Sequence, residues 1–253
     1  HNHSDHVSNA FNVSKEKLYA STRTLPKIEY VIEGSHLLVP FEKVQVGCFT
    51  LTPLPISHDA PNPVAFLVED GEESLVYRTD TGFVPEKDFP YLVGKTYYIF
   101  ESNHDPKRLF ESKRPDYLIR RITSDKGHLA NCDAGYYLSL FVSESTKEVV
   151  LAHLSDECNT PDIALETVKS VLLRQLGYVP ECRIVCANDR TESKGGNELT
   201  FAFLFRERHG KHSFFLDIRN ISSVFLNMQN VKLSLFRKSL LARKQVLRKF
   251  QLL

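Results

Sequence analysis

The sequence lacks the long apolar runs that membrane helices need. No stretch of its 253 residues approaches the roughly 18 consecutive apolar residues expected of a transmembrane span. It also lacks a recognisable signal peptide, although it does not begin with methionine, which leaves room for a segment before it. Internal repeats and low-complexity segments are absent. The composition, 42% hydrophobic and 25% charged, is typical of a soluble globular protein.

Cysteine is scarce and scattered. An odd set of five cysteines argues against a disulfide framework and favours a reducing compartment, the cytoplasm. Cys182 and Cys186 bracket a strand-like stretch, CRIVC, where a structural role is expected rather than a metal site.

The charge is unevenly divided along the chain. Residues 1–198 hold 21 Lys/Arg and 29 Asp/Glu, a balance of −8, whereas residues 199–253 hold 11 and 2, a balance of +9. Such a break indicates two regions with different histories or different partners. We therefore predict a main domain over 1–198 and a basic C-terminal extension over 199–253.

The main domain has the pattern of an α/β protein. Helix signals are clearest at 160–178, where Thr160 is a plausible N-cap, Pro161 fits the first helical position and Gly177 fits the C-terminal cap. A second helix is predicted over 129–142. Strand-like runs rich in β-branched and aromatic residues are predicted at 17–22, 36–46, 48–56, 64–70, 74–80, 95–102 and 147–155. Strands followed by a helix, a strand and a helix predict a layered α/β domain.

The first six residues, HNHSDH, concentrate four possible metal ligands: His1, His3, Asp5 and His6. Imidazole and carboxylate together suit zinc, manganese or iron better than calcium. Two ions about 3.5 to 4 Å apart, as in two-metal hydrolases, would use such a cluster. The alternative interpretations are a purification-tag remnant and a solvated histidine cluster.

Single ionisable residues recur where strand-like runs end. His58 follows PLPIS, Asp80 follows SLVYRT, and His153 follows EVVLA. The carboxyl ends of strands are where α/β folds place their sites. One histidine at a strand end is usually structural, but three such residues after an HxHxDH motif favour a shared site.

This ordered set resembles the ligand order of the metallo-β-lactamase fold hydrolases. The words SHDAPNPVAFLVEDG, YRTDTGFVP, ESNHD, SDKGHLAN and LAHLSDECNTPDIALETV resemble the YycJ/WalJ branch, bacterial enzymes regarded as DNA exonucleases or phosphodiesterases. The resemblance covers residues 1 to about 194. It implies a metallo-β-lactamase-like αββα sandwich, here lacking its first strands, because the family has several strands before HxHxDH.

The resemblance also implies roles for the ligands. His1, His3 and His58 would hold a first divalent ion, zinc or manganese, and Asp80 would bridge to a second. The second ion would be held by Asp5, His6 and His153. A hydroxide activated by the two metals would attack phosphorus, with Asp5 orienting it.

Further residues are expected around the substrate. His128, in GHLAN, is a candidate to bind the scissile phosphate or to protonate the leaving oxygen, or else a structural residue at a helix start. Asn103 and His104, in ESNHD, are expected to line the site or to serve a turn. Asn131 is expected to order the loop bearing His128. Basic residues before His128 could meet substrate phosphates or form a solvated face; they are Arg114, Arg120, Arg121 and Lys126.

The resemblance makes a metal-dependent phosphodiesterase or exonuclease acting on DNA the first functional hypothesis. A thioester or lactone hydrolase like glyoxalase II, with the same fold, is the second. An inactive fragment that only binds metal or nucleic acid is the third. The tail at 199–253 leaves three interpretations open: a basic arm for nucleic acid, an amphipathic membrane-surface helix with Leu233, Phe236, Leu240 and Leu247 on one face, or unselected sequence.

Overall fold

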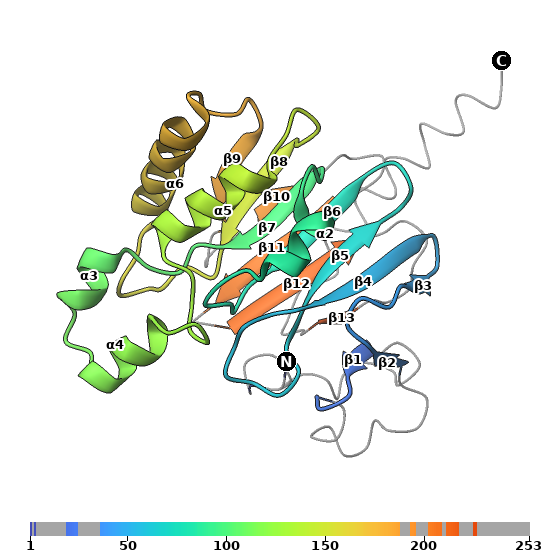
Figure 1. The fold of residues 1–253 in the computed structure, drawn as a ribbon, viewed down its shortest axis with the longest axis horizontal. Coiled ribbons are helices and arrows are strands. Elements are labelled where there is room, and N and C mark those ends of the chain that lie inside the picture. The colour runs from blue at the N-terminus through green and yellow to red at the C-terminus, as the bar shows by residue number, and fades with distance from the viewer. Residues whose placement is uncertain are drawn as a thin grey trace, which may run out of the picture.

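In the computed structural model, a mixed seven-stranded sheet with helices on one face forms the body of the molecule (Figure 1). The structure describes residues 1, 3, 19–24 and 36–187, and the backbone strands at 193–195, 202–208, 211–217 and 225–226. The sheet has the order β3-β4-β5-β6-β7-β8-β9. Its strands are β3 (Val44–Val46), β4 (Phe49–Pro55), β5 (Val64–Glu69), β6 (Ser74–Arg78), β7 (Tyr97–Glu101), β8 (Glu148–Ala152) and β9 (Arg183–Cys186).

The pairing directions decide which strand ends meet. β4, β5 and β6 pair antiparallel in sequence, whereas β6, β7, β8 and β9 pair parallel. Two successive antiparallel pairings make β4 run in the same direction as β6. The carboxyl ends of β4, β6, β7 and β8 therefore lie at one edge of the sheet.

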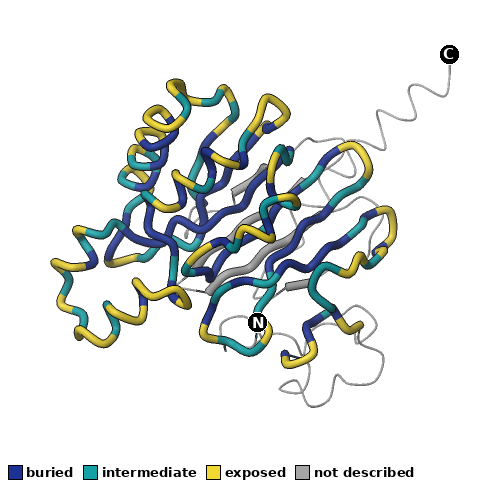
Figure 2. The backbone as a smooth tube through the Cα atoms, viewed as in Figure 1, coloured by how far each residue is buried: buried dark blue, intermediate teal, exposed yellow. Residues whose placement is uncertain are grey.

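Both faces of the central strands are buried, as Figure 2 shows for the dark blue strands in the middle of the sheet. In β7, Tyr98 and Phe100 join one hydrophobic cluster, while Tyr97 and Ile99 join another. Side chains of a strand alternate between faces, so every residue of β7 packs against something. This explains why the four residues at 97–100 are hydrophobic in succession instead of alternating with polar residues.

Two helices cover the first of these faces. Helix α5 (Asn131–Phe141) and helix α6 (Pro161–Leu176) pack on each other and contribute buried residues to the cluster that contains Tyr98. At Gly135 a Cβ would lie 2.8 Å from Cβ of Val171, so only glycine allows this closeness of α5 to α6. Among the described residues, none of the helices has both the length and the apolarity to cross a bilayer.

The helix signals of α6 are confirmed. Thr160 has an extended backbone and its side chain accepts a hydrogen bond from the amide of Ile163, and Gly177 is left-handed with φ of 79°. The predicted helix over 129–142 is α5, which begins two residues later. The predicted strand at 147–155 is β8.

The structure corrects the single strand expected over 36–46. It forms β2 (His36–Leu38) and β3, separated by a turn in which the amide of Glu42 donates to the carbonyl of Val39. Pro40 has no amide hydrogen, and Phe41 is left-handed with φ of 69°, so the strand cannot continue through them. β2 pairs in parallel with β1 (Tyr19–Ser21), which falls in the strand-like run at 17–22.

Short helical segments between the strands were not predicted. They are the 3-10 turn η4 (Glu86–Asp88), α2 (Phe89–Leu92), α3 (Pro106–Phe110) and α4 (Asp116–Ile122). In Figure 1, α3 and α4 lie together beyond the edge of the sheet. They belong to the connection between β7 and α5.

A second sheet has the order β10-β11-β12-β13, with β10 (Ser193–Gly195), β11 (Ala202–Arg208), β12 (Lys211–Asp217) and β13 (Phe225–Leu226). β11 and β12 form an antiparallel hairpin. The predicted domain boundary at 198 falls between β10 and β11, which pair with each other, and it stays a prediction. The helix face proposed over 233–247 lies outside the described residues.

The N-cap of α6 gives a stability prediction. Replacing Thr160 with Ala removes the side-chain acceptor for the Ile163 amide, so the free energy of unfolding should fall by about 0.5–2 kcal/mol. Thr160→Ser keeps the hydroxyl and should retain most of the stability. Urea unfolding followed by circular dichroism measures both. Equal losses in the two variants would contradict the cap.

Candidate metal and phosphodiester site

Ionisable side chains gather at the sheet edge where β4, β6, β7 and β8 end. His58 follows β4, Asp80 follows β6, Glu101 closes β7 and His153 comes directly after β8. The parallel orientation of these strands is what brings together residues that are almost one hundred positions apart in sequence.

The first group consists of three imidazoles. His1, His3 and His58 each offer a ring nitrogen, and these atoms all lie within 4.8 Å of one another. The ring centroids of His58 are 4.8 Å from those of His1 and 5.1 Å from those of His3. Nε2 of His1 lies 3.1 Å from Nδ1 of His3. The structure thus assembles the three residues expected to hold the first ion.

The second group consists of Asp80, His128 and His153, whose ligand atoms also lie within 4.8 Å of one another. The rings of His128 and His153 are 4.9 Å apart, and the rings of His58 and His128 are 5.3 Å apart. The two groups therefore adjoin. Asp5 and His6, expected to hold the second ion, lie outside the described residues.

Asp80 stands between the two groups. Its Oδ1 is 3.9 Å from Nε2 of His58 and 3.5 Å from Nε2 of His153, which is the arrangement a bridging carboxylate needs. Both Asp80 and His153 have left-handed backbones, with φ of 58° and 60°. Residues other than glycine rarely adopt this conformation, and backbone strain of this kind clusters at functional sites.

Glu101 is a site residue that the sequence analysis missed. Its side chain is fully buried, and one carboxylate oxygen accepts hydrogen bonds from Nδ1 of His128, at 2.8 Å, and from Nδ1 of His153. The other oxygen accepts from the backbone amides of Thr81, at 2.7 Å, and Leu129. The carboxylate therefore fixes both rings with Nδ1 protonated, and Nε2 of each ring is left for the site.

Charge and burial compete at Glu101. Burial would raise its pKa, but the adjacent His128 and His153, through their charge and their hydrogen bonds, outweigh burial and lower the pKa to about 2. The carboxylate is thus ionised at neutral pH. Its only sequence signal is its position at the end of KTYYIFES, which also fits an ordinary strand end.

The loop carrying His128 is held by two close backbone contacts. A Cβ at Gly127 would lie 2.0 Å from the carbonyl oxygen of Ile122, and one at Gly82 would lie 2.3 Å from that of Asp125. Gly82 follows Asp80 by two residues. The loops that bear Asp80 and His128 therefore touch, which fixes one relative to the other.

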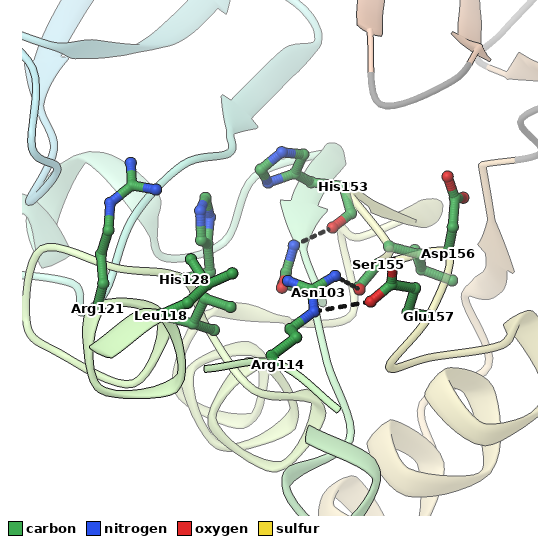
Figure 3. A pocket seen from close by; sticks show the side chains of 11 residues that line it. Asn103, Arg114, Leu118, Arg121, His128, His153, Ser155, Asp156 and Glu157 are labelled. Carbon is green, nitrogen blue, oxygen red and sulfur yellow. Dashed lines mark hydrogen bonds and ion pairs between the residues drawn. The ribbon is translucent and has the colours of Figure 1, made fainter. Parts of the chain in front are cut away.

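A cavity of about 280 Å³ opens beside His128 and His153 (Figure 3). Arg121 lies on one side of it and Asp156 and Glu157 on the other, while Arg114 lies below Asn103 and bonds Glu157. Its lining residues are Asn103, Arg114, Leu118, Arg121, Ile122, His128, His153, Leu154, Ser155, Asp156 and Glu157. Of the four basic residues expected near substrate, Arg114 and Arg121 line the cavity, whereas Arg120 and Lys126 are exposed outside its lining.

The three amide and imidazole residues expected near substrate differ in position. Asn103 lines the cavity, and its side-chain amide donates to the carbonyl of His153 at 2.7 Å. His104 is 3% exposed, and burial lowers its pKa to about 4. Asn131 is fully buried and exchanges amide hydrogen bonds with Asn159. Asn131 and His104 thus shape the loops around the site without being among the residues that line the cavity, and their expected roles toward substrate stay predictions.

Asp59, a second residue that the sequence analysis missed, borders the histidines. Its carboxylate lies 3.4 Å from Nε2 of His58 and 3.7 Å from Nε2 of His3, and it accepts a bond from Nε of Arg121 at 2.6 Å. It comes directly after His58 in SHDA, so adjacency in sequence was the available signal.

The donor chemistry fits divalent ions. His58 is buried, and burial lowers its pKa, so the ring is neutral at pH 7 and able to coordinate a metal. Within the part of the chain that the structure describes, the buried Nδ1 of His58 has no hydrogen-bond partner. Imidazole nitrogens and one central carboxylate are the donors that zinc, manganese and iron accept.

Two curated sequence relatives are named exodeoxyribonucleases. The exodeoxyribonuclease YycJ of Bacillus anthracis is 29% identical over 180 residues, covering 68% of this chain and 68% of the relative. The exodeoxyribonuclease WalJ of Streptococcus pneumoniae is 29% identical over 182 residues with the same coverage. The chain is similar to the YycJ and WalJ exonucleases. No protein-family model matches it.

Solved structures give the fold. The metallo-β-lactamase fold protein YhfI of Bacillus subtilis has a TM-score of 0.53 at 19% identity, over 74% of this chain and 72% of YhfI. Zn(2+)-bound PqqB of Methylobacterium extorquens has a TM-score of 0.51 at 12% identity, over 74% of this chain and 66% of PqqB. The predicted metallo-β-lactamase-like α/β fold is confirmed.

The bonds of Glu101 give a prediction on metal affinity. Glu101→Gln keeps the size of the side chain but removes the charge that orients His128 and His153, so affinity for zinc or manganese should fall about 10- to 100-fold. Competition with a chromophoric chelator measures it. Glu73→Gln is the matched control, because Glu73 is also a buried glutamate but precedes β6 and bonds Tyr97. Equal affinities of wild type and Glu101→Gln would contradict the orienting role.

Proposed function

We propose that this chain is a metal-dependent exonuclease that hydrolyses phosphodiester bonds at DNA ends. The observation that carries the proposal is that two groups of possible metal ligands, His1/His3/His58 and Asp80/His128/His153, adjoin each other. They do so on a chain similar to YycJ and WalJ. Two adjoining donor groups with a carboxylate between them suit two-metal hydrolysis.

The metal ligands are proposed residue by residue. His1, His3 and His58 would hold one ion, and Asp80 and His153, with Asp5 and His6, a second. Divalent ions bound there supply Lewis-acid activation of water and neutralise charge on the phosphate. Zinc and manganese both suit the donors. Asp5 is also proposed to orient the attacking water.

His128 is proposed as the group that meets the scissile phosphate and protonates the leaving oxygen. Its Nδ1 is engaged by Glu101, so its Nε2 is the nitrogen available to a substrate in the adjoining cavity. Donation from Nε2 needs a ring that carries a proton on both nitrogens, and the Nδ1 proton stays in the hydrogen bond to Glu101. Once the phosphorus–oxygen bond breaks, the leaving oxygen takes the proton from Nε2.

The cavity adds features that suit a nucleic-acid end. Arg114 and Arg121 stand in its wall close to His128, and guanidinium groups are well matched to phosphate. A thioester or lactone substrate offers no phosphate for these arginines, which is why the phosphodiester is preferred over the glyoxalase II-like alternative.

The test uses end-labelled single- and double-stranded DNA with zinc, manganese or magnesium. Wild-type protein should release nucleotides from ends, and His128→Ala should lower kcat about 10²- to 10⁴-fold while retaining bound metal. His36→Ala is the control, because His36 lies on β2 and belongs to neither donor group. Release from neither DNA form, alongside hydrolysis of a thioester or lactone, would overturn the proposal in favour of the alternative.

A further inference from the structure

The connection between β7 and α5 carries a concentrated positive charge. We define the α3–α4 arm as residues 106–126. The arm holds seven Lys/Arg and three Asp/Glu, a balance of +4, whereas the rest of residues 1–198 holds 14 and 26, a balance of −12. A local basic patch on an otherwise acidic domain is the electrostatic footprint of nucleic-acid binding.

The arm stands at the mouth of the active-site cavity. Arg114, Leu118 and Arg121, all from the arm, line the cavity that also contains His128 (Figure 3). The arm therefore offers a strand whose end reaches His128 a basic surface beside the cavity.

Two acidic residues outside the arm hold its cavity-lining arginines in place. Nε of Arg114 bonds Glu157 at 2.9 Å, and Nε of Arg121 bonds Asp59 at 2.6 Å. Both bonds use the inner nitrogen of the guanidinium group. The outer nitrogens of Arg121 make no hydrogen bond within the described residues, so they can bind a phosphate without breaking the pair with Asp59.

An exposed aromatic ring lies beside these charges. Tyr117, in the first turn of α4, is 71% exposed. Arg120 and Arg121 follow it by three and four residues, so both neighbour its side chain on the helix surface. A single exposed tyrosine is ordinary, but one beside two arginines on a helix whose Leu118 and Arg121 line the cavity has the composition of a base-stacking platform.

We infer that the α3–α4 arm binds single-stranded DNA leading into the cavity, with Tyr117 stacking on a base and Arg120 contacting a phosphate. This inference rests on the proposed function and names the substrate form it prefers. The exposed ring needs a base whose face is free, which any base of an unpaired strand can offer, whereas a duplex offers only the outer face of its terminal pair. The positive arm attracts the phosphates of that strand irrespective of sequence.

Binding to a fluorescein-labelled pyrimidine 12-mer, measured by anisotropy in a metal chelator, separates affinity from hydrolysis. Tyr117→Ala should weaken binding about 5- to 100-fold, because a stacking contact is lost. Tyr117→Phe keeps the ring and should bind like wild type. Tyr178→Ala is the matched control: Tyr178 is also a tyrosine, 59% exposed, but follows the far end of α6.

Two further measurements distinguish stacking from charge. Arg120→Ala should reduce the slope of log affinity against log salt by about 1, whereas Tyr117→Ala should leave the slope unchanged. Binding of a blunt duplex should be weakened less by Tyr117→Ala than binding of the single strand.

A third measurement, with metal restored, links binding to activity. The ratio of kcat/KM for the oligonucleotide to kcat/KM for bis(p-nitrophenyl) phosphate should fall in Tyr117→Ala.

Equal single-strand affinity of wild type and Tyr117→Ala would overturn the inference, as would an equal loss on single strand and duplex. Wild-type protein that binds no single strand would overturn it too. If wild type binds single strands through Tyr117 yet releases no nucleotides with any metal, the proposed exonuclease fails while the binding surface stands.

Discussion

The site depends on one buried carboxylate. One carboxylate oxygen of Glu101 accepts hydrogen bonds from Nδ1 of His128 and Nδ1 of His153, and the other oxygen accepts from two backbone amides. A buried charge without such partners would be unstable, so the glutamate and the two histidines must fold together. That mutual dependence determines which nitrogen each ring presents to the cavity, and it links the end of β7 to the end of β8.

The sheet supplies the other constraint. Parallel pairing of β6, β7 and β8, with β4 in the same direction, delivers residues from four separate segments to one edge. The central strands are buried on both faces and mostly apolar, so the candidate ligand side chains gather where the strands end. The sequence pattern could predict this, because His58, Asp80 and His153 each follow an apolar run. The central strands were predictable from their apolar runs, and α6 was predictable from its cap residues. The segment of α5 was predictable as a helix as well.

Other features depend on contacts that no local pattern encodes. Glu101 ends an apolar run as many glutamates do, and only its burial between two imidazoles distinguishes it. α3 and α4 were missed because they are short, and their starts are set by prolines: Pro106 is the first residue of α3, and Pro115 is the N-cap of α4. The β11–β12 hairpin was missed because its aromatic residues and charges resemble those of an arm or a surface helix as well as those of a strand pair.

The α3–α4 arm is closed at its base. The backbone amide of Asn103 donates a hydrogen bond to the carbonyl of Leu129, and His104 forms a parallel bridge with Ala130. The two ends of the connection therefore lie side by side. A segment that leaves and re-enters a fold at neighbouring points can change in length or composition with little effect on the strands beneath it. The end of the arm is the exception, because Ile122 and Asp125 lie against Gly127 and Gly82 and so support the loops that bear His128 and Asp80. Exposed positions of the arm such as Tyr117 and Arg120 can therefore change what the arm binds while the ligand histidines stay in place.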